Sequence, residues 1–198
     1  MKITSIGLRP IVETMLKDTV SSIHPSQRLY ASLMIDPLGY ENFFTSTTSY
    51  DGAIRPAPPS WAIVPALRQA LSQYPHTTHF FSLSPHALIM APSLALHEHI
   101  LNPLRLESLM LKDTPVIPPD SMIHTFGHLK ADAVDLVMSQ DGESLSHGSF
   151  ILRQGEWSRF FLDTWFDPLF RNYKFQKAEG HALVGDLHVL QKESAYLF

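Results

Sequence analysis

A serine and a histidine directly follow a strand-like run in the stretch HFFSLSPHALIM, which extends from His79 to Met90. In α/β enzymes, ligands and catalytic side chains commonly gather at the ends of strands. An imidazole titrates at about pH 6.5 and can act as a general acid or base without a metal ion. His86 is therefore the first candidate catalytic residue, and Ser84 is a candidate for substrate binding. The alternative is that His86 lines a pocket left over from an ancestral protein and has no functional role.

Three further polar residues lie beside apolar runs. Asp141 closely follows the run AVDLVMS, where its carboxylate could orient a substrate hydroxyl or pair with a histidine. The sequence Gln-Asp-Gly also favours a plain turn, which is the alternative role for Asp141. Ser146 and His147 precede the run GSFILR. Because adjacent residues of a strand point apart, these two do not predict a serine nucleophile paired with its base.

The remaining histidines and the cysteine count argue against a metal centre. HTFGH, from His124 to His128, has two histidines four residues apart, but Gly127 and the preceding PPDS predict a loop. No Glu occupies the second position, as it would in a zincin. The sequence has no cysteine, which excludes disulfides, thiolate metal sites and cysteine nucleophiles. We expect neither a metal site nor a cofactor.

Composition restricts the class of protein. With 198 residues, 44% of them hydrophobic and 17% charged, the chain fits one ordered domain, 1–198. A net charge of -4 without a basic run argues against a nucleic-acid partner. No apolar run reaches about 18 residues, the N-terminus lacks a signal-peptide pattern, and no Asn-X-Ser/Thr sequon occurs. We therefore expect a cytoplasmic protein without a membrane span, and homo-oligomerisation stays open.

The elements that would position the candidate residues alternate between helix and strand. Apolar spacing predicts helices over residues 11–23, 27–34, 61–74, 93–101, 157–169 and 178–191. Apolar runs predict strands over residues 78–83, 133–139 and 148–153. Residues 35–59, rich in Gly, Pro, Ser and Thr, have no sustained period and predict a long loop. Alternation of this kind is typical of a layered α/β fold.

The order of these segments resembles glycosyltransferase family 34. The segments are PSWAIVPALRQALSQYP, LSPHALIM, DLVMSQDGESLSHGSFILRQGEWSRFFLDTW and AEGHALVGDL, and the resemblance covers about residues 28–190. Its most specific part is GSFILRQGEWSRFFLDTW. The family includes fungal Golgi galactosyl- and mannosyltransferases and plant xyloglucan xylosyltransferases. The resemblance implies an α/β, GT-A-like fold, with a Rossmann-like sheet sandwiched by helices, here as a truncated single domain.

The chain departs from the family where the family binds its metal. There the strand ends in Leu-Asp-x-Asp-Ala-x-Ile-Met, whose carboxylates hold Mn²⁺ on the donor diphosphate. Ser84 and His86 occupy the two acidic positions. A divalent cation that bridges phosphates prefers anionic oxygen ligands, and neither side chain is one. Ile63 replaces an expected Lys, Ser146 replaces an expected Asn, and the sequence stops at Phe198, before the family's late histidine-containing segment.

Other positions keep polar character. The resemblance places Asp141 at the acceptor side of the pocket and Glu179 where the family has an acidic residue before its last helix. Trp61 could stack on a ligand, although core packing is the favoured explanation. We expect the catalytic residues to be His86, Asp141 and Glu179, and the substrate-binding residues to be Ser84, Trp61, Ser146, His147 and His181.

Three functions are compatible with this inventory. The leading expectation is an enzyme that has lost Mn²⁺-dependent nucleotide-sugar transfer and now performs metal-independent acid/base or cyclisation chemistry on a small molecule. The first alternative is a metal-independent glycosyltransferase that uses a nucleotide sugar. It ranks second because a diphosphate needs nearby cations, and the candidate segments offer only Arg55 and Arg153. The second alternative is a non-catalytic subunit or binding module.

Overall fold

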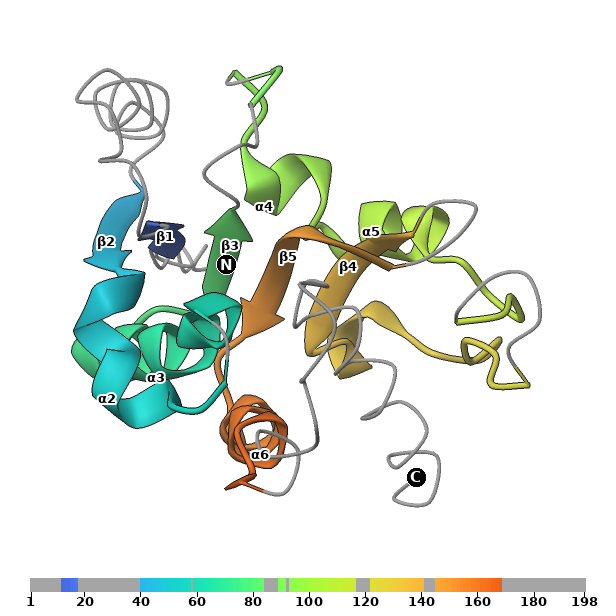
Figure 1. Ribbon diagram of the computed structural model, residues 1–198. Helices are drawn as coiled ribbons and strands as arrows, with labels where there is room; N and C mark the ends of the chain where they lie inside the picture. Colours follow the sequence, from blue (N-terminus) through green and yellow to red (C-terminus); the bar gives the residue numbers. More distant parts are fainter. Residues whose placement is uncertain are drawn as a thin grey trace.

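The computed structural model describes residues 12–17, 40–57, 59–83, 89–91, 93–116, 122–140 and 145–168, with only the backbone described over 12–17 and 145–148. Within these residues a five-stranded sheet has the order β2-β1-β3-β5-β4 (Figure 1). Its strands are β1 (Val12–Lys17), β2 (Glu41–Ser46), β3 (His79–Leu83), β4 (Leu136–Gln140) and β5 (Leu145–Arg153). The helices are α2 (Asp51–Ile54), α3 (Ile63–Gln73), α4 (Leu96–His99), α5 (Pro103–Leu109) and α6 (Glu156–Trp165). Short 3-10 turns are η2 (Thr47–Tyr50), η3 (Pro59–Ala62) and η4 (Ala131–Ala133).

The strand directions create one edge at which several chain segments meet. β1 pairs in parallel with both β2 and β3, whereas β5 runs antiparallel to β3 and β4. The carboxyl ends of β1, β2, β3 and β4 therefore lie at the same edge of the sheet as the start of β5. We call this the carboxyl edge. Near this edge, Met15 of β1 pairs with Leu83 of β3, and Leu83 pairs with Ser149 of β5. These three residues are therefore level with one another across the sheet.

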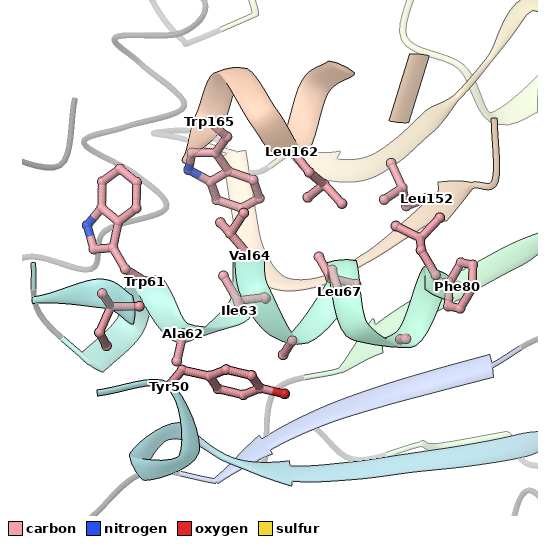
Figure 2. Packing of buried hydrophobic residues seen from close by; sticks show 14 of the residues in the cluster. Tyr50, Trp61, Ala62, Ile63, Val64, Leu67, Phe80, Leu152, Leu162 and Trp165 are labelled. Atoms are coloured by element: carbon pink, nitrogen blue, oxygen red, sulfur yellow. The ribbon is translucent and has the colours of Figure 1, made fainter. Parts of the chain in front are cut away.

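The main core lies between helices α3 and α6 and one face of the sheet (Figure 2). Leu67 of α3, Leu162 of α6 and the cross-strand pair Phe80 and Leu152 are each 0% exposed. Burial of each such side chain stabilises the fold by about 1.5–3 kcal/mol. The helices are also joined by an ion pair between Arg68 of α3 and Asp163 of α6.

The other face of the sheet is covered in part by α5. Side chains alternate between the two faces along a strand, so Phe81 and Ile151 lie opposite to their neighbours Phe80 and Leu152. Phe81 and Ile151 line a cavity together with Leu106 of α5. The described residues therefore form a mixed α/β structure with helices on both faces of the sheet, as expected from the sequence.

The helix predicted over residues 61–74 is confirmed. Pro59 opens the turn η3, and α3 continues from Ile63 to Gln73. Its apolar residues Val64, Leu67 and Leu71 lie three and four positions apart and are buried. The chain leaves the helix at Tyr74, directly before Pro75, which cannot donate a helical hydrogen bond. The strands predicted near 78–83, 133–139 and 148–153 correspond to β3, β4 and β5, and the helix near 157–169 to α6.

Two predictions near the N-terminus are wrong. Residues 12–17 form strand β1 instead of part of a helix over 11–23. The strand is hydrogen-bonded on both sides, by β2 and by β3, and this pairing outweighs the helix-like spacing of its apolar residues. The long ordered loop predicted over residues 35–59 is also wrong, because β2, η2 and α2 lie within this range.

Other elements differ in extent or cannot be compared. The helix predicted over 93–101 is only the single turn α4, and α5 was not predicted. Asn102 starts α5, since its side-chain oxygen accepts hydrogen bonds from the backbone N–H groups of Leu104 and Arg105. The helices predicted over 27–34 and 178–191 lie outside the described residues. In the described part of the chain, no helix has the length and apolar character needed to cross a membrane.

Candidate functional site

The carboxyl edge gathers three of the segments singled out in the sequence. β3 ends at Leu83, directly before Ser84 in the sequence. β4 ends at Gln140, directly before Asp141. β5 begins with Leu145 and reaches Leu83 only at Ser149, so the backbone of residues 145–148 extends past the end of β3. A sheet edge of this kind is where α/β proteins commonly bind ligands.

The structure locates only some of the predicted site residues. Ser146 and His147 belong to β5, and their backbone lies at the carboxyl edge. Trp61 is also described, and five other candidates lie outside the described residues: Ser84, His86, Asp141, Glu179 and His181.

Trp61 belongs to the core and not to a binding surface. Its side chain is 1% exposed and packs in the cluster that contains Val64 and Trp165 (Figure 2). A ring enclosed in this way offers no free face on which a ligand could stack. Of the two roles considered for Trp61, the structure therefore favours core packing, and the substrate-binding role is corrected.

Lys17 is a residue of this edge that sequence reasoning missed. It is the last residue of β1, the strand at the centre of the parallel part of the sheet, and it pairs with Ser46 at the end of β2. Met15 lies level with Leu83, so Lys17 lies two residues beyond the end of β3. The prediction of a helix over 11–23 concealed this position. A lysine at the end of an apolar strand-length segment was the signal that could have indicated it.

Gln140 holds a neighbouring segment against the edge. Its side-chain Nε2 donates to the carbonyl oxygen of Pro115 over 2.7 Å and to that of Val116 over 3.2 Å. The same segment is closed by a bridge between Pro115 and His124. The prediction of a loop for HTFGH is confirmed, since no helix includes His124 or His128.

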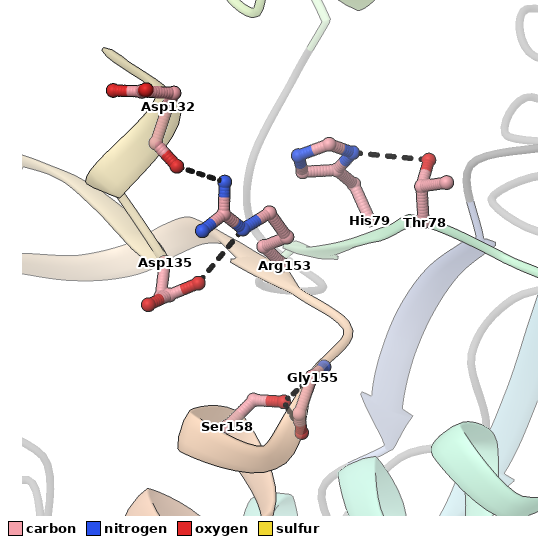
Figure 3. Close-up of polar contacts among 7 residues, drawn as sticks. All are labelled: Thr78, His79, Asp132, Asp135, Arg153, Gly155 and Ser158. Atoms are coloured by element: carbon pink, nitrogen blue, oxygen red, sulfur yellow. Dashed lines mark hydrogen bonds and ion pairs between the residues drawn. The ribbon is translucent and has the colours of Figure 1, made fainter. Parts of the chain in front are cut away.

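A second polar cluster lies at the opposite edge of the sheet (Figure 3). Arg153, the last residue of β5, donates from Nε to the carboxylate of Asp135 over 2.8 Å and from Nη1 to the carbonyl oxygen of Asp132 over 2.6 Å. His79 begins β3 beside them, and burial lowers its pKa, with a further lowering from Arg153 and a smaller opposing effect of Asp135. Arg153 is thus engaged far from the carboxyl edge and is not available there to offset a diphosphate. Arg55 remains exposed at the end of α2.

Among the described residues, no group of three or more His, Asp or Glu side chains is arranged to hold a metal ion. The segment after Leu83 supplies a hydroxyl and an imidazole at the positions of interest, Ser84 and His86.

The sequence of this chain is similar to the sequences of known proteins. Residues 7–197 match the model of the galactosyl transferase GMA12/MNN10 family. An uncharacterized alpha-1,2-galactosyltransferase of Schizosaccharomyces pombe is 30% identical over 138 residues, which cover 70% of this chain and 41% of that protein. An alpha-1,2-galactosyltransferase of the same organism is 27% identical over 180 residues, 83% of this chain and 47% of that protein. The probable alpha-1,6-mannosyltransferase MNN10 of Saccharomyces cerevisiae is 30% identical over 115 residues, 58% of this chain and 29% of that protein. The chain spans less than half the length of these relatives.

One solved structure has a similar fold. It is the crystal structure of a glycosyltransferase involved in the glycosylation of the major capsid of PBCV-1. The TM-score is 0.53 at 11% sequence identity, and the match covers 94% of this chain and 77% of that chain. At this identity the likeness establishes the fold alone, which is mixed α/β.

Proposed function

The chain belongs to the galactosyl transferase GMA12/MNN10 family, and we propose that it takes part in the transfer of a hexose from a nucleotide sugar to a glycan acceptor. The observation that carries this proposal is the family match over residues 7–197. The relatives named as alpha-1,2-galactosyltransferases and alpha-1,6-mannosyltransferases support galactose or mannose as the transferred sugar. A GT-A-type arrangement of the sheet is part of the same proposal.

The expectation of an enzyme repurposed for acid/base or cyclisation chemistry is wrong. It was based on the missing carboxylates at Ser84 and His86, but the relatives across most of the chain are sugar transferases. The match to the family over residues 7–197 therefore supports glycosyl transfer more strongly than the two missing carboxylates support another reaction. Glycosyl transfer, which was the first alternative, replaces it.

We assign donor binding to the carboxyl edge. The ends of β1, β2 and β3 meet there, and the parallel part of such a sheet commonly binds nucleotides at this edge. Lys17 supplies a cation at the end of β1, which would offset charge on the diphosphate. His86 follows β3 in the sequence, and its imidazole could donate a hydrogen bond to a phosphate oxygen.

The side chains after β3 do not fit the metal site that the family resemblance implies. A hydroxyl at Ser84 and an imidazole at His86 replace two carboxylates, and a divalent ion that bridges phosphates prefers anionic oxygens. No step of the proposal passes through a metal ion at these positions. Acidic residues such as Asp141 and Glu179 then serve as candidates for orienting or deprotonating an acceptor hydroxyl.

A donor assay tests the proposal. The purified chain is incubated with UDP-galactose or GDP-mannose and a panel of oligosaccharide acceptors, with and without Mn²⁺, and products are identified by mass spectrometry. UDP-glucose, which differs from UDP-galactose in one hydroxyl configuration, is the matched control. We expect a hexose-extended product with the galactose or mannose donor and less with the control. No product and no nucleotide release from any donor would contradict the proposal and favour a binding module.

A further inference from the structure

A small pocket lies at the edge of the sheet opposite to the carboxyl edge, and we call it the amino-edge pocket. Its polar wall contains His79 at the start of β3, Arg153 at the end of β5 and Asp135 directly before β4 (Figure 3). His79 and Leu83 are four residues apart, so at about 3.3 Å per residue the pocket lies roughly 13 Å from the carboxyl edge. The pocket is therefore separate from the proposed donor site.

The polar side chains of this wall are held in place by one another and still have free hydrogen-bonding groups. Arg153 donates from Nε to Asp135 and from Nη1 to the carbonyl oxygen of Asp132, and Nδ1 of His79 lies 3.1 Å from Oγ1 of Thr78. Among the described residues, Nη2 of Arg153, Nε2 of His79 and the second carboxylate oxygen of Asp135 have no hydrogen-bond partner. The wall thus presents donors and an acceptor in a fixed arrangement.

The facing wall of the pocket is apolar. It contains Leu101, Leu106 of α5 and Ile151 of β5. Leu106 is 6% exposed and Ile151 is 3% exposed, so both are held firmly by their neighbours. The volume of the pocket is about 180 Å³, below the roughly 300–1,000 Å³ of pockets that enclose drug-sized ligands. A ligand that fills it is therefore small and combines polar groups with an apolar face.

The charges around the pocket indicate a neutral ligand. Asp132 and Asp135 carry two negative charges against the single positive charge of Arg153. Burial lowers the pKa of His79, so its imidazole is neutral at about pH 7 and does not restore the balance. Two carboxylates disfavour an anion such as phosphate. No group of three or more His, Asp or Glu side chains in the described part of the chain is arranged for a metal ion.

We propose that the amino-edge pocket binds one neutral hexose unit of a glycan, as a carbohydrate site apart from the proposed donor site. Arg153 donates from Nη2 to one sugar hydroxyl, and the Asp135 carboxylate accepts a hydrogen bond from another. The C–H groups of the sugar ring contact the wall that contains Leu106 and Ile151. Binding at this pocket does not depend on sugar transfer at the carboxyl edge, so the two proposals can fail separately.

A nuclear magnetic resonance titration of the full chain tests the proposal. The probes are methyl α-D-mannopyranoside and methyl α-D-galactopyranoside. We expect at least one of them to cause saturable changes in the side-chain signals of His79 and of Arg153 Nε–H. His79→Leu removes the imidazole and should weaken this binding by about tenfold or more. His128→Leu is the matched control, because His128 is exposed and does not line the pocket, and it should bind as the unmodified chain does.

A second variant guards against a His79 variant that fails to fold. Leu101→Trp fills the pocket from its apolar wall and should also abolish binding, with the native fold verified by circular dichroism. Excess UDP should leave the affinity for the glycoside unchanged. No saturable binding of either glycoside, or equal affinities of His79→Leu and His128→Leu, would overturn the proposal. Competition by UDP would overturn it by placing the glycoside at the donor site, and stronger binding of inorganic phosphate at the same signals would indicate an anion site instead.

Discussion

In the proposed function, the donor diphosphate lies next to the segment that follows β3, which contains Ser84 and His86. A carboxylate pair would supply anionic oxygens for a divalent cation, whereas a hydroxyl and an imidazole supply hydrogen-bonding groups without negative charge. The charge of the diphosphate then has to be offset by basic side chains. We propose Lys17, the last residue of β1, for this role. Arg153 is engaged with Asp135 at the other edge of the sheet.

Restoring the carboxylates tests this interpretation. We expect the double variant Ser84→Asp/His86→Asp to bind UDP-galactose more tightly when Mn²⁺ is added, because two carboxylates create a site for a hard cation. The unmodified chain should show a smaller effect of Mn²⁺. The measurement is a calorimetric titration of both proteins at equal Mn²⁺ concentration. Stronger Mn²⁺ dependence in the unmodified chain would show that other residues hold a metal.

Removing the charge of Lys17 should weaken donor binding. A hydrogen bond to a charged group contributes about 1.5–3 kcal/mol, so Lys17→Gln should raise the dissociation constant for UDP roughly tenfold or more. Arg159→Gln is the matched control, because it removes one positive charge from an exposed position on α6. Equal affinities of the two variants, measured by titration calorimetry, would exclude Lys17 from the donor site.

His79 should make stability depend on pH. Its folded-state pKa is lowered, chiefly by burial and then by Arg153, so the unfolded chain binds a proton more readily. Stability from the neutral imidazole is present above the unfolded pKa of about 6.5 and is lost as pH falls below it. In denaturant titrations at about pH 7.5 and about pH 5.5, we expect His79→Gln to lose less stability on acidification than the unmodified chain.

The control for that prediction is His99→Gln, which replaces an exposed histidine on α4. It should keep the pH dependence of the unmodified chain. If His79→Gln and His99→Gln lose equal stability on acidification, then the lowered pKa of His79 does not contribute to the pH dependence of stability.

At the scale of elements, the sequence predicted a helix or strand correctly where the indicative residues lie within or directly beside that segment. α3 has proline before it, a proline after it and an apolar stripe between them, so both its bounds and its buried face were predictable. β1 failed because its identity depends on two partners distant in sequence, β2 and β3. Spacing within six residues cannot reveal such pairing, and the same error concealed Lys17.

The contact between α3 and α6 should contribute strongly to stability. Leu162 of α6 is 0% exposed, and Leu162→Ala should lower the free energy of unfolding by about 2–5 kcal/mol. Phe160→Ala, on the same helix at 55% exposure, is the matched control and should cost less than about 0.5 kcal/mol. Urea denaturation measures both. Similar losses in the two variants would contradict the packing described here.

At the scale of the whole molecule, the order of segments predicted the layered α/β fold and the family. The sequence also placed Ser84, Asp141 and Ser146 next to strand ends. It could not show that these strand ends meet at one edge, because strand order and direction are set by long-range pairing. The change of function inferred from Ser84 and His86 was wrong because two positions were given more weight than the whole chain. The similarity in fold and family extends over nearly all of the chain.

The most direct test of the central claim is a calorimetric titration of the purified chain with UDP, GDP and their hexose conjugates. If the carboxyl edge binds a nucleotide-sugar donor, at least one of these ligands should bind with one-to-one stoichiometry, and the hexose conjugate should compete with the free nucleotide for the same site. The absence of binding by every nucleotide, with and without Mn²⁺, would contradict the assignment of a donor site to this edge.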